Sequence, residues 1–287
     1  MILPRRASVH EHGGRPCPGG RNNRDTAEFV YYMAHMENAA RILNWGLFAN
    51  YWAVNLPERK VVADQSIMSR YGRREHRKFV NLYFGTHTAM QHTITRGKHS
   101  PMSEEDLVFL RFDADDLFQF EGAKFSDGNV ASDNSKVFSA EEDSEELKNL
   151  IWPIILCQKK YNKSKSAKRT KMAELLIPNY IPPSHIHSVV VLNSESEDKL
   201  CSLIKTDASE EYLEALRNIR DDSDFDSPSG EDDIALEPNH EVDIIRDGGR
   251  RHFYRYGDGD GGYQVPSIDF GDVVYDLFDN LKGGEEE

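Results

Sequence analysis

A glutamate at the start of an apolar run is the first residue whose position indicates chemistry. Glu174 precedes Leu175, Leu176 and Ile177, and the stretch AELLIP is typical of a buried strand. A carboxylate on a half-buried strand needs polar partners, because burying an isolated charge is costly. Glu174 is therefore either a catalytic carboxylate or an edge-strand charge that keeps sheets from aggregating. The residue and its neighbours alone leave both interpretations open.

A dense group of cations stands directly before this strand. Seven lysines and arginines fall within thirteen residues, with Tyr161 among them: Lys159, Lys160, Lys163, Lys165, Lys168, Arg169 and Lys171. Such a group is either a contact surface for phosphates or a solvated loop. Its place next to Glu174 favours the first interpretation. We therefore predict that Lys163, Lys165, Lys168, Arg169 and Lys171 bind nucleic acid.

The net charge is unevenly distributed along the chain. Residues 221–287 contain 20 acidic and 5 basic side chains, whereas residues 1–220 contain 29 acidic and 30 basic ones. The overall charge of −14 is thus a property of the C-terminal segment. An acidic composition of this kind does not exclude a nucleic-acid partner for the rest of the chain.

Composition divides the chain into three parts. Residues 1–27 are rich in proline, glycine and arginine, and we expect a disordered, mildly basic arm. Residues 28–220 carry the patterns of strands and helices and are expected to form one folded domain. Residues 221–287 are expected to be acidic and largely disordered, with a short docking helix near 273–281, where apolar residues recur at helical spacing.

The folded part is predicted to belong to the α+β class. Strand patterns cover 28–34, 79–84, 106–112, 173–178 and 186–193, and helix patterns cover 38–47, 196–205 and 209–220. These elements do not alternate regularly as strand, helix and strand, so a doubly wound parallel sheet is excluded.

Cysteine usage and hydropathy restrict the cellular setting. Cys17, Cys157 and Cys201 lie far apart without a CxxC pair, which argues against a disulfide framework and a zinc site and favours a reducing cytoplasm. No apolar stretch approaches the ~20 residues that a membrane span needs, and we expect no secretory signal. Asp222, Asp224 and Asp226 lack the glycine and final glutamate of a calcium loop, so no metal site is predicted.

Five segments occur in an order that identifies a family. They are YYMAHMENAARILNWGL, VVADQSIMSR, FVNLYFGTHTAM, SDGNVAS and KRTKMAELLIPNYIPPSHI. In this order they resemble the motifs of the DarT-type DNA ADP-ribosyltransferases, over about residues 28–195. The first is similar to the family's opening strand and helix through His35 and Asn38, and the last to the strand that carries a catalytic glutamate.

The resemblance implies a fold and a reaction. The fold would be that of the ADP-ribosyltransferases, a split mixed or antiparallel sheet with NAD in a central cleft. The enzyme would transfer ADP-ribose from NAD onto a nucleobase of single-stranded DNA and release nicotinamide, as a toxin or defence effector. Its partners would be single-stranded DNA and an antitoxin that removes the modification, and we expect a monomer.

The resemblance also assigns roles to residues. Glu174 would be catalytic, beside the 2′-hydroxyl of the nicotinamide ribose, where it stabilises developing positive charge. The predicted NAD contacts are Tyr32, His35, Arg70, Tyr83 and Phe84, with Arg73 or Arg74 as alternatives to Arg70. Tyr32 stands where the family often has a histidine, and His35 has the alternative of a purely structural role. Met172, two residues before Glu174, argues against protein arginine as the acceptor.

Alternative functions remain open at this stage. The same fold could transfer ADP-ribose to RNA or to a 2′-phosphate, and the latter reaction would depend on basic residues rather than on Glu174. A non-enzymatic nucleic-acid-binding module would use the cations without consuming NAD. The acidic segment could also compete with DNA for those cations, or serve only as a solubilising tail.

Overall fold

The computed structural model describes residues 27–60, 74–85, 103–156, 165–206, 208–223, 225, 241–246 and 251–255. Two predicted site residues, Arg70 and Lys163, lie outside these ranges, as do Arg73 and the expected helix near 273–281. The described elements are short strands and helices, which agrees with the predicted α+β class.

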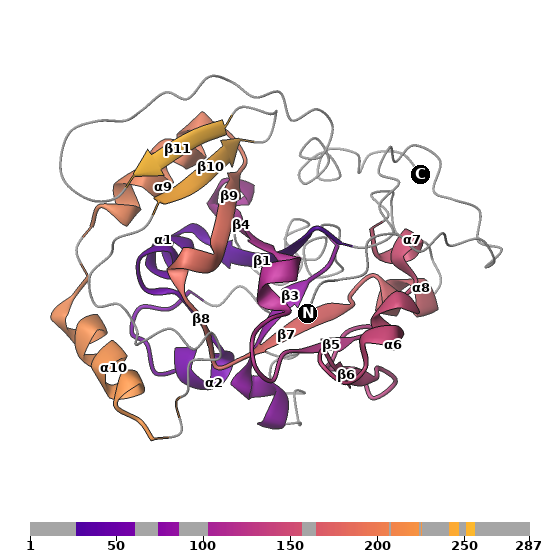
Figure 1. The fold of residues 1–287 in the computed structure, drawn as a ribbon. Helices are drawn as coiled ribbons and strands as arrows, with labels where there is room; N and C mark the ends of the chain where they lie inside the picture. The colour runs from indigo at the N-terminus through magenta and orange to yellow at the C-terminus, as the bar shows by residue number, and fades with distance from the viewer. Residues whose placement is uncertain are drawn as a thin grey trace.

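The strands contribute to one large and one small sheet (Figure 1). They are β1 (Phe29–His35), β2 (Leu47–Phe48), β3 (Phe79–Tyr83), β4 (Leu107–Asp113), β5 (Lys124–Ser126), β6 (Val137–Ser139), β7 (Glu174–Pro178), β8 (Tyr180–Ile181), β9 (Ile186–Val191), β10 (Glu241–Arg246) and β11 (Arg251–Arg255). The α-helices are α1 (Met36–Trp45), α2 (Asn50–Ala53), α5 (Ala114–Leu117), α6 (Ser144–Lys148), α7 (Trp152–Ile155), α8 (Lys165–Thr170), α9 (Ser194–Ile204) and α10 (Glu210–Arg220). The 3-10 turns are η1 (Arg74–Lys78), η2 (Glu104–Asp106) and η3 (Pro183–His185).

The large sheet is split into two halves. Its order is β11-β10-β9-β4-β1-β3-β7-β5-β6, and all neighbours are antiparallel except β9 and β10. β1 pairs with β4 along its whole length, and β3 pairs with β7 along its whole length. Between β1 and β3, by contrast, the register of the described residues consists of one pair, Tyr31 and Tyr83. The predicted split, mixed sheet is therefore confirmed.

The two faces of this sheet carry different side chains. Because side chains alternate along a strand and cross-strand partners share a face, the register assigns each residue to one face. Val30, Leu82 and Leu175 lie on the face that packs against α1 in the main hydrophobic core. Tyr83 and Glu174 lie on the opposite face. The strands that carry the candidate catalytic residue are thus anchored by the core on their reverse side.

The first helix follows from its sequence pattern. Ile42 and Leu43 belong to the buried stripe of α1, which its apolar spacing predicts. His35 caps the start, since its side chain accepts a hydrogen bond from the Glu37 N–H. Gly46 ends the helix with a φ of +86°, a conformation that L side chains rarely adopt. The expected helix is confirmed, with a start two residues earlier than predicted.

Two strands come from a segment for which the sequence predicted no packed structure. β10 pairs in parallel with β9, and β11 pairs with β10, so residues 241–246 and 251–255 extend the sheet (Figure 1). Val242 and Ile244 of β10 join the main core. The predicted boundary at residue 220 is therefore corrected, because part of the acidic segment supplies apolar residues to the folded domain.

Candidate functional site

Glu174 lies where the two halves of the sheet meet. It opens β7 and is 1% exposed, and its cross-strand partner on β3 is Tyr83. Tyr83 in turn pairs with Tyr31 on β1, and Tyr31 pairs with Arg111 on β4. The register therefore places these four residues in one row across four strands. A buried carboxylate in one row with two tyrosines and an arginine is a site with acid–base capacity.

One oxygen of the Glu174 carboxylate is held by donors. Its Oε2 accepts a hydrogen bond from the Val130 N–H at 3.1 Å and one from the Asn81 side-chain amide at 3.4 Å. Its Oε1 is buried and has no hydrogen-bond partner among the described residues. Buried polar atoms are nearly always paired, so an orphaned acceptor in a fixed position indicates a place for a donor from a ligand.

Burial determines the protonation of this carboxyl. Burial raises the pKa of Glu174 from 4.5 to about 8, because the charged form is desolvated. The Val130 N–H, the Asn81 amide and the neighbouring Tyr83 hydroxyl favour the charged form and lower this pKa, but their combined effect is smaller. Glu174 therefore exchanges its proton near neutral pH, which suits a residue that accepts one during a reaction.

The loop after β5 presents the Val130 N–H to the carboxylate. Ser126 Oγ, completely buried, accepts a hydrogen bond from the Glu174 N–H at 3.1 Å and donates one to the Gly128 carbonyl at 2.6 Å. Arg169 ties the same loop to α8, through an ion pair with Asp127 at 3.0 Å. The loop and the first residue of β7 are consequently fixed relative to each other.

Ser126→Ala is expected to lower the free energy of unfolding by about 1–3 kcal/mol, because the buried Glu174 N–H would lose its acceptor. Urea unfolding measures this change. Ser135→Ala is the matched control, since its buried hydroxyl has no partner among the described residues and its removal is expected to be nearly neutral. Equal losses in both variants would show that the Ser126 hydrogen bonds do not hold the loop.

Of the two neighbouring tyrosines of β1, Tyr31 rather than the predicted Tyr32 shares the face of Glu174. Tyr32 pairs with Leu110 and packs against the main hydrophobic core. Burial raises the pKa of both tyrosine hydroxyls, so both stay neutral donors at physiological pH. Tyr31 therefore lies in the same row as Glu174, with Tyr83 between them, and the contact of Tyr32 with NAD stays a prediction.

Phe84 is a core residue, and its predicted stacking on nicotinamide stays a prediction. It is 1% exposed, stacks on Phe118 at 6.2 Å between ring centroids and contacts the Trp152 ring edge to face at 5.2 Å. Tyr83 fits the other half of that prediction, because it lies on the face of Glu174 and is 8% exposed. The one-residue difference reverses the face on which each ring lies.

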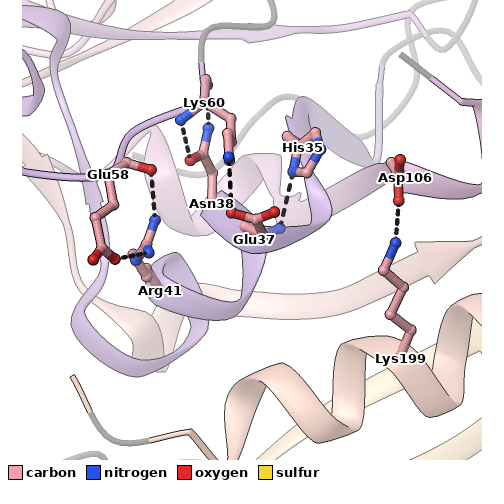
Figure 2. Close-up of polar contacts among 8 residues, drawn as sticks. All are labelled: His35, Glu37, Asn38, Arg41, Glu58, Lys60, Asp106 and Lys199. Carbon is pink, nitrogen blue, oxygen red and sulfur yellow. Dashed lines mark hydrogen bonds and ion pairs between the residues drawn. The ribbon is translucent and has the colours of Figure 1, made fainter. Parts of the chain in front are cut away.

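His35 is held by its helix-capping bond (Figure 2). Its Nδ1 accepts from the Glu37 N–H at 3.2 Å, which leaves Nε2 to carry the proton of the neutral ring. Two ion pairs flank it, Lys60 with Glu37 and Lys199 with Asp106. Burial lowers the His35 pKa, so the neutral ring is favoured. Nδ1 therefore has a structural role as the helix cap, and a contact of Nε2 with NAD stays a prediction.

Asn38 has a positional role. Its side chain makes two reciprocal hydrogen bonds with the backbone of Lys60, accepting from the N–H at 3.0 Å and donating to the carbonyl at 2.5 Å (Figure 2). Nearby, Arg41 forms an ion pair with Glu58. These contacts attach residues 58–60 to α1.

The predicted nucleic-acid contacts have different environments. Lys165 is the first residue of α8, and Lys168 is exposed on the same helix. Arg169 is occupied by Asp127 and by the Asn134 carbonyl, which makes it a loop anchor. Lys171 is 5% exposed, and burial lowers its pKa to about 8. Lys171 is thus buried, and its predicted contact with nucleic acid stays a prediction.

Three residues that hold Glu174 were not found from the sequence. Asn81, Ser126 and Val130 come from other strands or loops, 93, 48 and 44 residues away from it. The SDGNVAS motif did mark the loop, but the active group is the Val130 backbone N–H, which every residue except proline carries. In the described part of the chain, no group of three or more His, Cys, Asp or Glu is arranged to hold a metal ion. No helix there is long and apolar enough to span a membrane.

Comparisons with known proteins agree on one family. The family model described as "ssDNA thymidine ADP-ribosyltransferase, DarT" matches residues 31–218. A curated relative, a "DNA ADP-ribosyl transferase-DNA ADP-ribosyl glycohydrolase fusion protein" of Thermosipho africanus, is 24% identical over 178 residues, which is 60% of this chain and 44% of the relative. This chain thus matches less than half the length of that relative.

Solved structures share the fold. DarT of Thermus sp. 2.9 in complex with ADP-ribosylated ssDNA has a TM-score of 0.56 and 19% identity, over 62% of this chain and 88% of that one. The same Thermus protein with NAD+ has a TM-score of 0.53 and 18% identity, over 62% and 89%. Thermosipho africanus DarTG with ADP-ribose has a TM-score of 0.54 and 22% identity, over 62% and 48%. At these identities the likeness establishes the fold.

Proposed function

Because this chain belongs to the DarT family of ssDNA thymidine ADP-ribosyltransferases, we propose that it transfers ADP-ribose from NAD to a base of single-stranded DNA. The observation that carries the proposal is the buried Glu174 carboxylate, with one oxygen held by two donors and the other without a partner among the described residues. Related structures contain NAD+ and ADP-ribosylated ssDNA, which supports the same pair of substrates here.

The reaction exchanges one glycosidic bond for another. The bond between the ribose C1′ and the nicotinamide nitrogen breaks, and its electron pair leaves with nicotinamide. A base nitrogen then bonds to C1′ and loses its proton. The transition state carries positive charge on the ribose, so a fixed carboxylate beside it lowers the barrier.

Glu174 fits both tasks that this exchange sets. Its orphaned Oε1 offers an acceptor for the 2′-hydroxyl of the nicotinamide ribose, while the Asn81 amide and the Val130 N–H keep Oε2 in place. The positive charge of the nicotinamide ring favours the ionised carboxylate and so opposes the effect of burial. In its ionised form Glu174 can also take the proton of the attacking base.

Single-stranded DNA suits a carboxylate that is buried. A base within a duplex is stacked and paired, so its ring nitrogen can reach an enclosed carboxylate only after the base has been unstacked and unpaired. A base in a single strand is already unpaired. Thymine is the base named by the family, and its N3–H supplies the proton to be removed. We propose a monomer that acts in the cytoplasm. We also propose an antitoxin that removes the ADP-ribose, since the Thermosipho relative is a transferase–glycohydrolase fusion.

Mass spectrometry of oligonucleotides after incubation with NAD tests the reaction. We expect a single-stranded DNA that contains thymine to gain one ADP-ribose and a thymine-free control to gain none. RNA oligonucleotides and an RNA with a 2′-phosphate test the other acceptors on the same fold. Modification of RNA alone would replace DNA as the acceptor. Absence of any product, with NAD intact, would overturn the proposed activity.

A further inference from the structure

A pair of cation–aromatic contacts lies at the end of β3 that is remote from Glu174. Lys124 Nζ is 5.1 Å from the centroid of the Phe79 ring, and Lys78 Nζ is 5.2 Å from that of Tyr51. Tyr51 is 42% exposed, one of the few large hydrophobic side chains so exposed in the described part of the chain. Lys78 and Phe79 are consecutive, so both contacts involve residues where η1 ends and β3 begins. We call Tyr51, Arg77, Lys78, Phe79 and Lys124 the β3 platform.

The inner half of the platform lies on the face of the catalytic carboxylate. Phe79 pairs with Pro178 at one end of the β3–β7 ladder, and Tyr83 pairs with Glu174 at the other. Residues two apart on a strand share a face, so Phe79 and Tyr83 lie in line. Lys124 reaches this face too, since it pairs with Leu176. Glu174 and Pro178 are four positions apart on β7, about 13 Å at the rise of a strand.

Two cations of the platform have no carboxylate partner in the described part of the chain. Arg77 and Lys124 form no ion pair there, and the buried Nε of Arg77 has no hydrogen-bond partner there. Other cations of the domain do have such partners: Arg41, Lys60, Lys148, Arg169, Lys199, Arg217 and Arg220. Positive charge beside aromatic rings is therefore available at this end of the sheet.

We propose that the β3 platform binds the nucleotides that flank the modified base, and so sets how much single-stranded DNA the site takes. This inference rests on the proposed function, since it assumes that a DNA base lies beside Glu174. Exposed aromatic rings stack on bases without sequence preference, and neighbouring cations contact the phosphates. A separation of about 13 Å corresponds to roughly four stacked nucleotides at ~3.4 Å each.

The proposal differs from the role assigned to the cations before β7. Arg169 holds a loop and Lys171 is buried, so those two are not placed for phosphate contacts. The platform combines an exposed charge with an exposed ring, the two kinds of group that bind single strands without sequence preference.

The test compares a long and a short substrate in the 287-residue chain. Tyr51→Ala combined with Lys124→Gln removes one ring and one charge, and Arg217→Gln on α10 is the control for lost charge. Both variants should keep the thermal stability of the wild type. With a thymine-containing 12-mer, we expect kcat/KM for the double variant to fall about tenfold and the control to stay unchanged. With a trinucleotide, we expect both variants to match the wild type.

Binding measured without NAD separates this inference from the proposed function. In a Glu174→Gln background, fluorescence anisotropy should show about tenfold weaker binding of the 12-mer by the double variant, with a smaller salt dependence. Unchanged affinity for the 12-mer, or an equal loss with the trinucleotide, would overturn the platform. Platform-dependent binding by a wild-type protein that modifies no oligonucleotide would refute the transfer reaction instead. Tighter binding of an RNA 12-mer than of DNA would overturn the assignment to DNA.

Discussion

Glu174→Gln is expected to lower the rate of ADP-ribose transfer about a thousandfold while the protein stays folded. Glutamine keeps the size of the side chain and an acceptor oxygen, but it carries no negative charge for the ribose and takes no proton from the base. Label transferred from NAD to a single-stranded oligonucleotide measures the loss. Wild-type rates in this variant would show that the carboxylate takes no part in the chemistry.

The stability of the Glu174→Gln variant relative to the wild type should increase as the pH rises. Since the folded-state pKa of Glu174 is about 8 and its ordinary value is 4.5, the folded protein keeps this proton while the unfolded chain loses it. Wild-type stability contributed by this group therefore falls between pH 4.5 and 8, by up to about 5 kcal/mol. Glutamine has no such dependence. The free energy of unfolding relative to the wild type should be measured at pH 5 and at pH 8. It should increase between these pH values for Glu174→Gln and stay the same for Glu211→Gln, an exposed control on α10.

Activity should have the opposite pH dependence to stability. If the ionised carboxylate is required, kcat/KM for NAD rises with pH and levels off above about 8, since this parameter reports the free enzyme. A profile that is flat between pH 6 and 9 would contradict this role of Glu174.

Gly46→Ala is expected to cost about 3–5 kcal/mol of unfolding free energy. The φ of +86° and ψ of 174° at the end of α1 belong to a region that is essentially restricted to glycine. A Cβ there would also overlap the Tyr180 ring, whose hydroxyl donates to the Trp45 carbonyl. Backbone strain and overpacking would therefore add. Urea unfolding measures the loss.

Gly122→Ala is the control for the Gly46 substitution. Gly122 also has a positive φ, of +70°, but its Cβ would meet one side-chain atom, Pro178 Cγ at 3.3 Å. The loss at this position should therefore reflect backbone strain alone, about 1–2 kcal/mol. Equal losses at the two positions would show that the Tyr180 ring moves aside at no cost.

The sequence predicted the longer elements of the domain, because their apolar residues are dense and regularly spaced; they are β1, β3, β4, β7, β9, α1, α9 and α10. β4 was found as a run in which Leu107 to Phe112 are all buried, and α1 as a helix that ends at Gly46. Glu174 was identified as the catalytic candidate from the order of motifs. Periodicity could not decide between Tyr31 and Tyr32, because two adjacent residues of the same type look alike in the sequence. Only the strand register shows that Tyr31 lies on the face of Glu174 and Tyr32 on the opposite face.

Contacts between distant segments account for what was missed. The donors to Glu174 lie 44 and 93 residues away from it, and nothing in either local pattern marks them. β10 follows an acidic stretch, and its pairing with β9 joins residues 55 positions apart, such as Ser188 and Asp243. Local composition indicates the apolar strands, but such pairings depend on the whole sheet.

The parallel pairing of β10 with β9 has a practical consequence for where the chain can be cut. Ending the chain at residue 220 would remove the acidic segment and β10 together. The strand IHSVVV of β9 would then present its backbone groups to solvent or to another molecule. A shortened protein could precipitate or self-associate for that reason alone, whatever the acidic residues do to DNA binding. Replacing the acidic side chains outside 241–255 with neutral ones keeps the sheet intact and isolates the effect of charge.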